Sequence, residues 1–185
     1  HSFPTRRSSD LSVIQWNPGW IIITKIEGKT LREITPTKKD YIKVGKAYKK
    51  LHSINYADNN LNWQDDQIKK SAKNLNLPNE IIEYIQTYKT NNERRLLHGD
   101  PARGNIVINN SKISLIDFEW ANSGSPAKDV AKFLQKHDHS FSESFFEGYG
   151  PVPDDTYYYA LLFLVDQYCH SLKHGLRNQH NCKEK

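Results

Sequence analysis

The fold of this chain can be worked out from residues 96–120, which read LLHGDPARGNIVINNSKISLIDFEW. Residues 106–108 are a short apolar run of the kind that forms strands, and residues 113–116 are a second one. Between them lie Asn109, Asn110 and Ser111, which are typical turn residues. This pattern predicts a tight β-hairpin.

Three polar side chains flank this hairpin. Asp100 and Asn105 come before its first strand and Asp117 directly follows its second, so pairing of the strands brings Asp117 back beside the other two. Phosphoryl transfer needs such a set: a carboxylate orients the attacking hydroxyl, and oxygen ligands hold Mg²⁺ against the phosphates of a nucleotide. The sequence therefore indicates a magnesium–phosphate site, and the alternative is three ordinary polar loop residues.

Helical periodicity dominates the rest of the chain. Thr37 and Asp40 have the spacing of a capping box, and the apolar positions after them predict a helix that ends near His52: Tyr41, Val44, Tyr48 and Leu51. Further helices are expected at about residues 64–75, 79–90, 141–148 and 155–175, another is expected to begin at Ser125-Pro126, and residues 13–26 are expected to form a hairpin. The polar tail after Leu176 is expected to fray.

Composition excludes several classes of protein. The chain has 185 residues, 37% of them hydrophobic, and its longest apolar run is far too short to span a membrane. The formal net charge of +5 permits an anionic partner such as a nucleotide, but no basic face with interleaved aromatics indicates nucleic-acid binding. The two cysteines do not make a disulfide framework, so a cytoplasmic setting is expected.

The ordered series of motifs resembles the aminoglycoside phosphotransferase family, a protein-kinase-like branch that also contains choline, ethanolamine and thiamine kinases. His98-Gly99-Asp100, with Asn105 five residues later, resembles its catalytic loop, and residues 116–119 resemble its metal loop. Residues 20–31, 51–54 and 124–131 resemble the last small-lobe strand and hinge, the first large-lobe helix and the segment after the metal loop. The resemblance covers about residues 13–135.

The resemblance implies a fold and a cofactor. The fold is α+β and protein-kinase-like, with a mainly helical C-terminal lobe, a catalytic β-hairpin and a truncated β remnant of the N-terminal lobe. The cofactors are ATP and Mg²⁺. Backbone groups of Thr24, Lys25 and Ile26 would face the adenine.

The resemblance also assigns roles around the hairpin. Asp100 would be the catalytic base or hydroxyl-orienting residue, and Asn105 and Asp117 would bind Mg²⁺. His98 would brace the catalytic loop, and Asp129 would hold it from below through hydrogen bonds. Arg103 either helps to neutralise phosphate charge or makes a surface salt bridge.

Departures from the protein-kinase pattern narrow the expected substrate. Protein kinases carry a lysine two residues past the catalytic aspartate, where this chain has Ala102, and a glycine in the metal loop, where it has Glu119. A protein substrate is thus disfavoured. We expect an ATP-dependent kinase acting on a hydroxyl of a small molecule similar to an aminoglycoside, choline or thiamine; the alternative is a nucleotide-binding pseudokinase or regulatory module without transfer activity.

The first eleven residues differ from the rest of the chain. Residues 1–11, HSFPTRRSSDL, resemble a short-read sequencing adapter translated in frame, so we expect them to be non-native. The remainder divides into a small-lobe remnant with the hinge (12–27), a kinase-like lobe (28–178) and a frayed tail (179–185). Before Val13 the sequence has neither a glycine-rich loop nor a strand lysine to clamp phosphates, so weak ATP binding and little transfer are expected from this polypeptide.

Four other residues were candidates for function. His137 and His139 have a spacing that permits metal binding, although a solvated helix end is the more common reason for it. Trp120, just after the metal loop, is a candidate for the border of the substrate pocket. Cys169 lies in an apolar helical stretch, which indicates a buried structural cysteine rather than a nucleophile.

Overall fold

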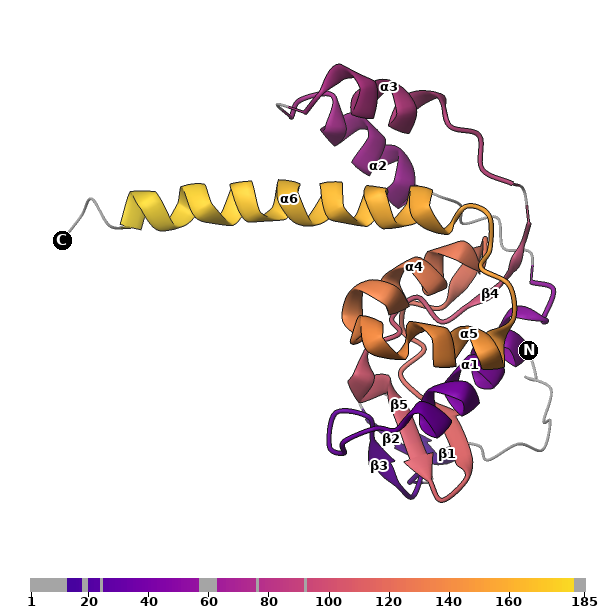
Figure 1. Cartoon of the computed structure of the whole chain (residues 1–185). Coiled ribbons are helices and arrows are strands. Elements are labelled where there is room, and N and C mark those ends of the chain that lie inside the picture. The colour runs from indigo at the N-terminus through magenta and orange to yellow at the C-terminus, as the bar shows by residue number, and fades with distance from the viewer. Residues whose placement is uncertain are drawn as a thin grey trace.

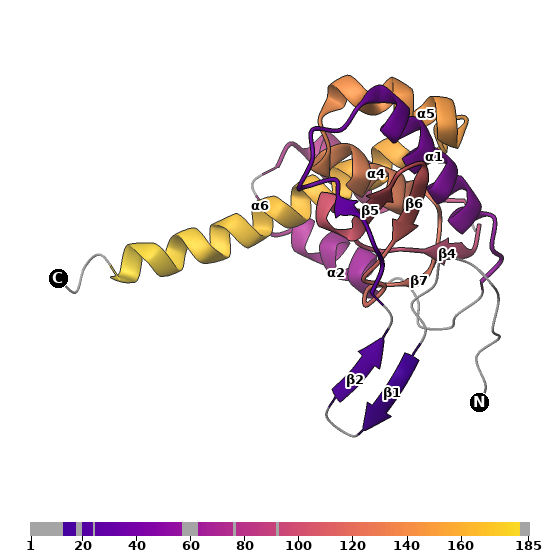
Figure 2. The same cartoon turned by 90° about the horizontal axis from the view of Figure 1, so that it is seen from below.

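The structure is a computed structural model, which describes residues 13–17, 20–23, 25–56, 63–75, 77–91 and 93–181. It is an α+β fold in which helices predominate and the strands form small antiparallel sheets, as expected (Figure 1). Strands β1 (Val13–Asn17) and β2 (Trp20–Ile23) form the hairpin expected at residues 13–26, and Figure 2 shows this hairpin apart from the helices.

The central hairpin is present as predicted. Strand β5 (Ile106–Asn109) pairs with β6 (Lys112–Leu115), with Ile106 opposite Leu115. Asn110 turns the chain with a φ of 53°, a left-handed conformation that asparagine tolerates better than most residues. A third strand, β3 (Lys29–Thr30), extends this sheet beside β5. Gly28 allows that approach, because a Cβ there would lie 2.4 Å from the carbonyl oxygen of Ile108.

A second pair of strands was not expected from the sequence. Strand β4 (Arg95–Leu97) pairs with β7 (Asn122–Gly124), so that Leu97 faces Asn122. These strands lie immediately before and after residues 98–121. The segment with the three polar residues is therefore tied together at both ends.

One hydrophobic core lies between α1 (Lys38–His52), α5 (Ser142–Tyr149), α4 (Ala127–Lys136) and the central hairpin. Thr37 and Asp40 form the predicted capping box at the start of α1. The four apolar positions used to predict this helix are all buried. This core therefore supports the end of α1, where His52 enters the candidate site.

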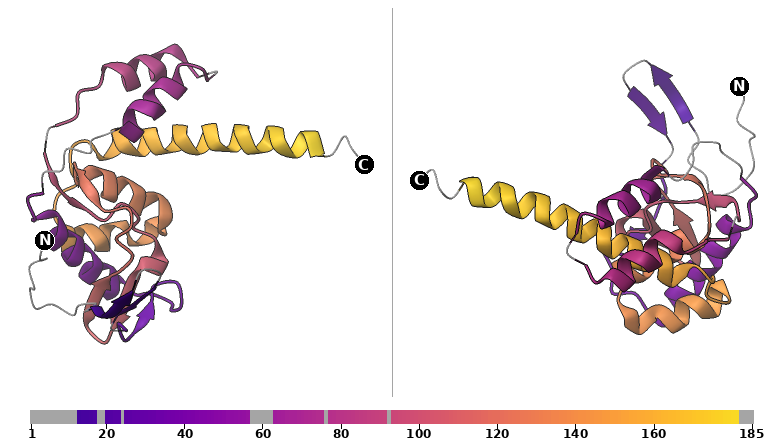
Figure 3. Two further views of the ribbon diagram at one scale, coloured as in Figure 1. Left: turned by 180° about the vertical axis from the view of Figure 1, so that it is seen from behind. Right: turned by 90° about the horizontal axis from the view of Figure 1, so that it is seen from above.

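A second core lies between α2 (Trp63–Ala72), α3 (Asn79–Thr87), α6 (Thr156–Asn181) and the other face of α4. Figures 1 and 3 show α2 and α3 beside the first part of α6, while the rest of α6 extends beyond the other helices. Helix α6 continues to Asn181, beyond the expected end of this helix near residue 175. Within the described residues, no helix is both long and apolar enough to cross a membrane.

Candidate active site

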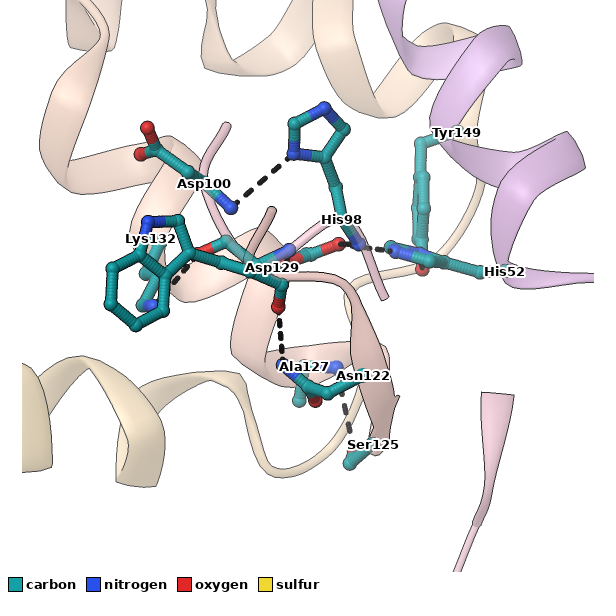
Figure 4. Close-up of polar contacts among 11 residues, drawn as sticks. His52, His98, Asp100, Asn122, Ser125, Ala127, Asp129, Lys132 and Tyr149 are labelled. Carbon is teal, nitrogen blue, oxygen red and sulfur yellow. Dashed lines mark hydrogen bonds and ion pairs between the residues drawn. The ribbon is translucent and has the colours of Figure 1, made fainter. Parts of the chain in front are cut away.

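The loop that carries Asp100 is anchored by Asp129, a buried residue in the first turn of α4. One carboxylate oxygen of Asp129 accepts hydrogen bonds from the backbone N–H of His98 at 2.7 Å and from His52 Nε2 at 3.1 Å. The other accepts from the backbone N–H of Gly99 at 2.9 Å. Figure 4 shows Asp129 beside His98 and His52. Burial opposes ionisation, but the hydrogen bond and charge of His52 and the two N–H groups outweigh it and lower the pKa of Asp129.

His98 links this loop to the end of the hairpin. Its ring Nε2–H donates to the carbonyl oxygen of Ile116 at 2.9 Å, and its Nδ1 accepts from the N–H of Asp100 at 3.3 Å. This pattern needs a neutral imidazole, and burial favours one because it lowers the pKa of His98. The residue that precedes Asp117 is thereby bonded to the loop that carries Asp100.

The structure brings Asp100 and Asn105 into direct contact. Asn105 ends a short 3₁₀ turn (Arg103–Asn105), and its Nδ2 donates to the carbonyl oxygen of Asp100 at 3.1 Å and to its Oδ2 at 2.9 Å. The carbonyl oxygen of Asn105 accepts from the N–H of Ile116 at 3.0 Å. Asp117 follows at once, exposed and with a φ of 64°. The three residues therefore meet at one end of the hairpin.

The donor set at this end fits Mg²⁺. The side-chain nitrogen of Asn105 donates to Asp100, so the side-chain oxygen Oδ1 of Asn105 is left to bind a cation. The opposite orientation of this amide would place Oδ1 against the oxygens of Asp100, which cannot donate to it. Asp117 adds an exposed carboxylate. Mg²⁺ is commonly held by one or two such ligands together with phosphates and water. Within the described residues, no cluster of three or more His, Cys, Asp or Glu side chains could hold a metal ion.

Two lysines at the site were not singled out from the sequence. Lys132 Nζ donates to the carbonyl oxygen of Gly99 at 2.8 Å, and burial lowers the pKa of this amine. Lys136 Nζ forms an ion pair with Asp100 Oδ1. Their spacing of three and seven residues after Asp129, which puts all three on one helix face, is the signal that could have revealed them.

Other expected site residues lie differently. Arg103 donates from its guanidinium to the carbonyl oxygen of Leu31 at 2.8 Å, and the described part of the chain contains no salt bridge to it. Of the hinge residues, Thr24 lies outside the described residues, Lys25 is exposed beside Glu27, and Ile26 is half-buried.

The other candidates from the sequence can also be placed. Trp120 is exposed, and a Cβ at Gly99 would lie 2.1 Å from its carbonyl oxygen, so it borders the loop with Asp100. His137 is buried rather than solvated: its Nε2 donates to the carbonyl oxygen of Pro101 at 2.8 Å and its Nδ1 contacts the Tyr41 hydroxyl at 2.9 Å, which leaves neither nitrogen for a metal. His139 is exposed, and Cys169 is buried as predicted.

Comparison with known proteins gives one family. The model of the phosphotransferase enzyme family, APH, matches residues 6–161. No curated protein sequence matches the chain.

Solved structures share the fold at low sequence identity. Choline kinase LicA from Streptococcus pneumoniae is 16% identical with a TM-score of 0.59, over 93% of this chain and 68% of its own. A GDP complex of aminoglycoside 2'-phosphotransferase-IIIa is 18% identical with a TM-score of 0.60, over 91% and 69%. A choline/ethanolamine kinase family protein from Mesorhizobium loti is 14% identical with a TM-score of 0.58, over 88% and 63%.

The chain thus spans about two thirds of the length of these structures. Its kinase-like fold, with a helical lobe around a short hairpin, agrees with the match of the family model to most of the sequence. The chain belongs to the phosphotransferase enzyme family, and this membership supports a small-molecule kinase.

Proposed function

We propose that this chain forms the catalytic lobe of an ATP-dependent, Mg²⁺-dependent kinase that phosphorylates a hydroxyl group on a small molecule. The observation that carries the proposal is the contact between Asp100 and Asn105 at the end of the hairpin where Asp117 emerges. Membership of a phosphotransferase family supports the reaction class. The acceptor classes we propose are aminoglycoside-like, choline-like and thiamine-like alcohols.

In the proposed mechanism, Asp100 receives the acceptor. Its carboxylate accepts a hydrogen bond from the acceptor hydroxyl, points the oxygen at the γ-phosphorus and takes up the proton late in the reaction. In a loose transition state the nucleophile needs little activation, so holding the hydroxyl in line contributes more than basicity. The short, doubly anchored loop suits that task.

Asn105 and Asp117 would hold the cation. Asn105 Oδ1 and the Asp117 carboxylate would bind Mg²⁺, which when bound supplies charge neutralisation on the phosphate oxygens. His98 and Asp129 keep these ligands near Asp100, because they bond the loop to Ile116 and to α4. The backbone at Thr24, Lys25 and Ile26 would meet the adenine. Relatives solved with GDP and AMP support use of a nucleotide.

A coupled ADP-release screen tests the proposal. The 185-residue chain, and the same chain preceded by a complete small lobe of a relative, are assayed with ATP and Mg²⁺ over aminoglycosides, choline, thiamine and sugars. We expect acceptor-dependent ADP release that Asp100→Ala abolishes, with much weaker turnover in the shorter chain because it has no glycine-rich loop or strand lysine. Equal turnover in both would refute the expected impairment.

In this screen, Asp154→Asn removes an exposed carboxylate from the loop before α6 and serves as a control that keeps full activity. The same screen also distinguishes the kinase from the alternative function. Nucleotide binding without ADP release for every acceptor, in the chain with the small lobe, would refute the kinase and support a nucleotide-binding pseudokinase.

A further inference from the structure

The carboxylate of Asp100 is held at both oxygens. Its Oδ2 accepts from Asn105 Nδ2 at 2.9 Å, and its Oδ1 is paired with Lys136 Nζ. A carboxylate held from one side can rotate about its last side-chain bond, whereas donors on both oxygens fix the plane of the group. The direction in which Asp100 can accept a third hydrogen bond is therefore set by Asn105 and Lys136 together.

Lys136 comes from the helix that already grips the loop. Along α4, Asp129 binds the N–H groups of His98 and Gly99, Lys132 binds the carbonyl oxygen of Gly99 one turn later, and Lys136 reaches Asp100 one turn after that. The order of contacts along the helix is the order of residues along the loop. The contacts that hold the loop with Asp100 against α4 therefore also fix the backbone of Lys136 relative to Asp100.

The other cations near the loop have different partners. Ala102 stands where protein kinases carry a lysine, Arg103 is bonded to Leu31, and Lys132 is bonded to the carbonyl oxygen of Gly99. The side chains of Lys136 and Asp100 are 44% and 28% exposed, so an acceptor can approach this pair. Among the described residues, Lys136 is the cation paired with the Asp100 carboxylate.

We propose that Lys136 is a positioning residue for the phosphoryl transfer: it fixes the carboxylate plane of Asp100 from the side opposite Asn105. The inference rests on the proposed function of Asp100. Replacing Lys136 with Met leaves Oδ1 without a donor and allows the carboxylate to turn away from Asn105. Replacing it with Arg retains a cationic donor.

The first test follows the side-chain amide of Asn105 by NMR in the ¹⁵N-labelled 185-residue chain, without substrate. In Lys136→Met, we expect hydrogen exchange of this amide to rise about tenfold, because its bond to Asp100 Oδ2 loosens. In Lys136→Arg it should stay within about twofold of the unmodified chain. Lys46→Met, which removes an exposed lysine from α1, is the matched control and should change nothing. An unchanged amide in Lys136→Met would overturn the proposal.

The second test uses an acceptor found in the ADP-release screen. Lys136→Met should lower kcat about 30-fold with the acceptor KM within about twofold, since the hydroxyl is bound but misaligned, and Lys136→Arg should recover most of the loss. Full kcat in Lys136→Met would overturn the proposal. Should no acceptor react, the kinase assignment fails, and the amide exchange still decides whether Lys136 fixes Asp100.

Discussion

At the scale of single residues, Asp129 has the largest effect on the site. It is buried, carries three hydrogen bonds and joins the end of α1, through His52, to the loop before Asp100. Removing one partner from a buried charged network lowers the stability by several kcal/mol, because the remaining polar groups stay buried away from water but lose their hydrogen bonds. The lowered pKa of Asp129 means that this stabilisation is present at neutral pH and is lost only as the pH falls below about 4.

We predict that Asp129→Asn lowers the free energy of unfolding by about 3 kcal/mol. The new amide group retains the shape, but its NH₂ faces an N–H donor, so at least one bond becomes a repulsion. Urea unfolding at pH 7 measures the loss. Asp154→Asn, at an exposed position, should stay within about 0.5 kcal/mol of the unmodified chain. Equal losses in the two variants would contradict the assigned role.

We predict an acid sensitivity centred on His137. Burial lowers the pKa of His137 from 6.5 to about 4. Between pH 6.5 and pH 4, this histidine is therefore protonated in the unfolded chain but neutral in the folded one. Stability is therefore full above pH 6.5 and falls as the pH drops toward 4, by about 2 kcal/mol between pH 7 and pH 5.

Urea unfolding at several pH values, with His137→Gln as the comparison, measures this contribution. Glutamine can donate to Pro101 and accept from Tyr41 but does not titrate in this range. The difference between the two stability curves should therefore shrink as the pH falls. A constant difference from pH 7 to pH 5 would show that His137 does not titrate as stated.

The partners of the polar residues at the end of α4 could not be predicted from the sequence. The apolar positions Val130 and Phe133 of α4 have helical spacing, and both are buried. Lys136 and His137 have the composition of a solvated helix end, and periodicity assigns such residues to solvent. Their actual partners, Asp100 and Pro101, belong to a loop distant in sequence. The helical spacing from Asp129 indicates these partners only if the position of the loop on this face of α4 is already known.

At the scale of elements, α1 and α5 pack closely against each other in the core that they share with α4. A Cβ at Gly45 of α1 would lie 2.1 Å from the carbonyl oxygen of Phe145, and one at Gly148 of α5 would lie 1.9 Å from that of Ile42. The two backbones touch at reciprocal glycines. This contact positions His52 and Tyr149, which bond to each other at the ends of these helices.

We predict that Gly45→Ala lowers the free energy of unfolding by about 3 kcal/mol, because the added methyl group meets backbone atoms on α5 that cannot move independently. Gly104→Ala is the matched control: its Cβ would have no neighbour within 4 Å, so stability should change by less than about 1 kcal/mol. Thermal unfolding of both variants provides the measurement. A stable Gly45→Ala variant would mean that α1 and α5 separate more easily than their contact indicates.

Elements fixed by local signals are the ones that the sequence predicted. The capping box at Thr37 and the turn at Asn110 act within a few residues, and both are confirmed. Strands β3 and β4 were missed because each is only two or three residues long and pairs with a strand more than twenty residues away. Neither has the alternating pattern of a strand with one buried face. Their pairing depends on Gly28 and on closure of the loop, which are tertiary effects.

At the scale of the whole molecule, α4 is shared by the two cores. Val130 and Phe133 belong to the core with α1 and α5, and Ala127 and Ala131 belong to the core with α2, α3 and α6. An ion pair of 2.6 Å between Asp65 and Lys128, largely buried, adds a link from α2 to α4. The site is attached to the core of α1 and α5 through His52 and Asp129, and α4 links that core to the other one.

This arrangement predicts a gradient of hydrogen exchange along α6. Among its side chains up to Leu172, Leu162 and Cys169 are buried, whereas Leu164, Tyr168 and Leu172 are exposed. Amides near Leu162, whose side chain is fully buried, should therefore exchange about tenfold or more slowly than those of Ser171 and Leu172, whose side chains are exposed. Backbone exchange measured by mass spectrometry or NMR on the 185-residue chain resolves the two halves. Equal protection at Leu162 and Leu172 would contradict this, since an exposed turn of helix would then open no more easily than a buried one.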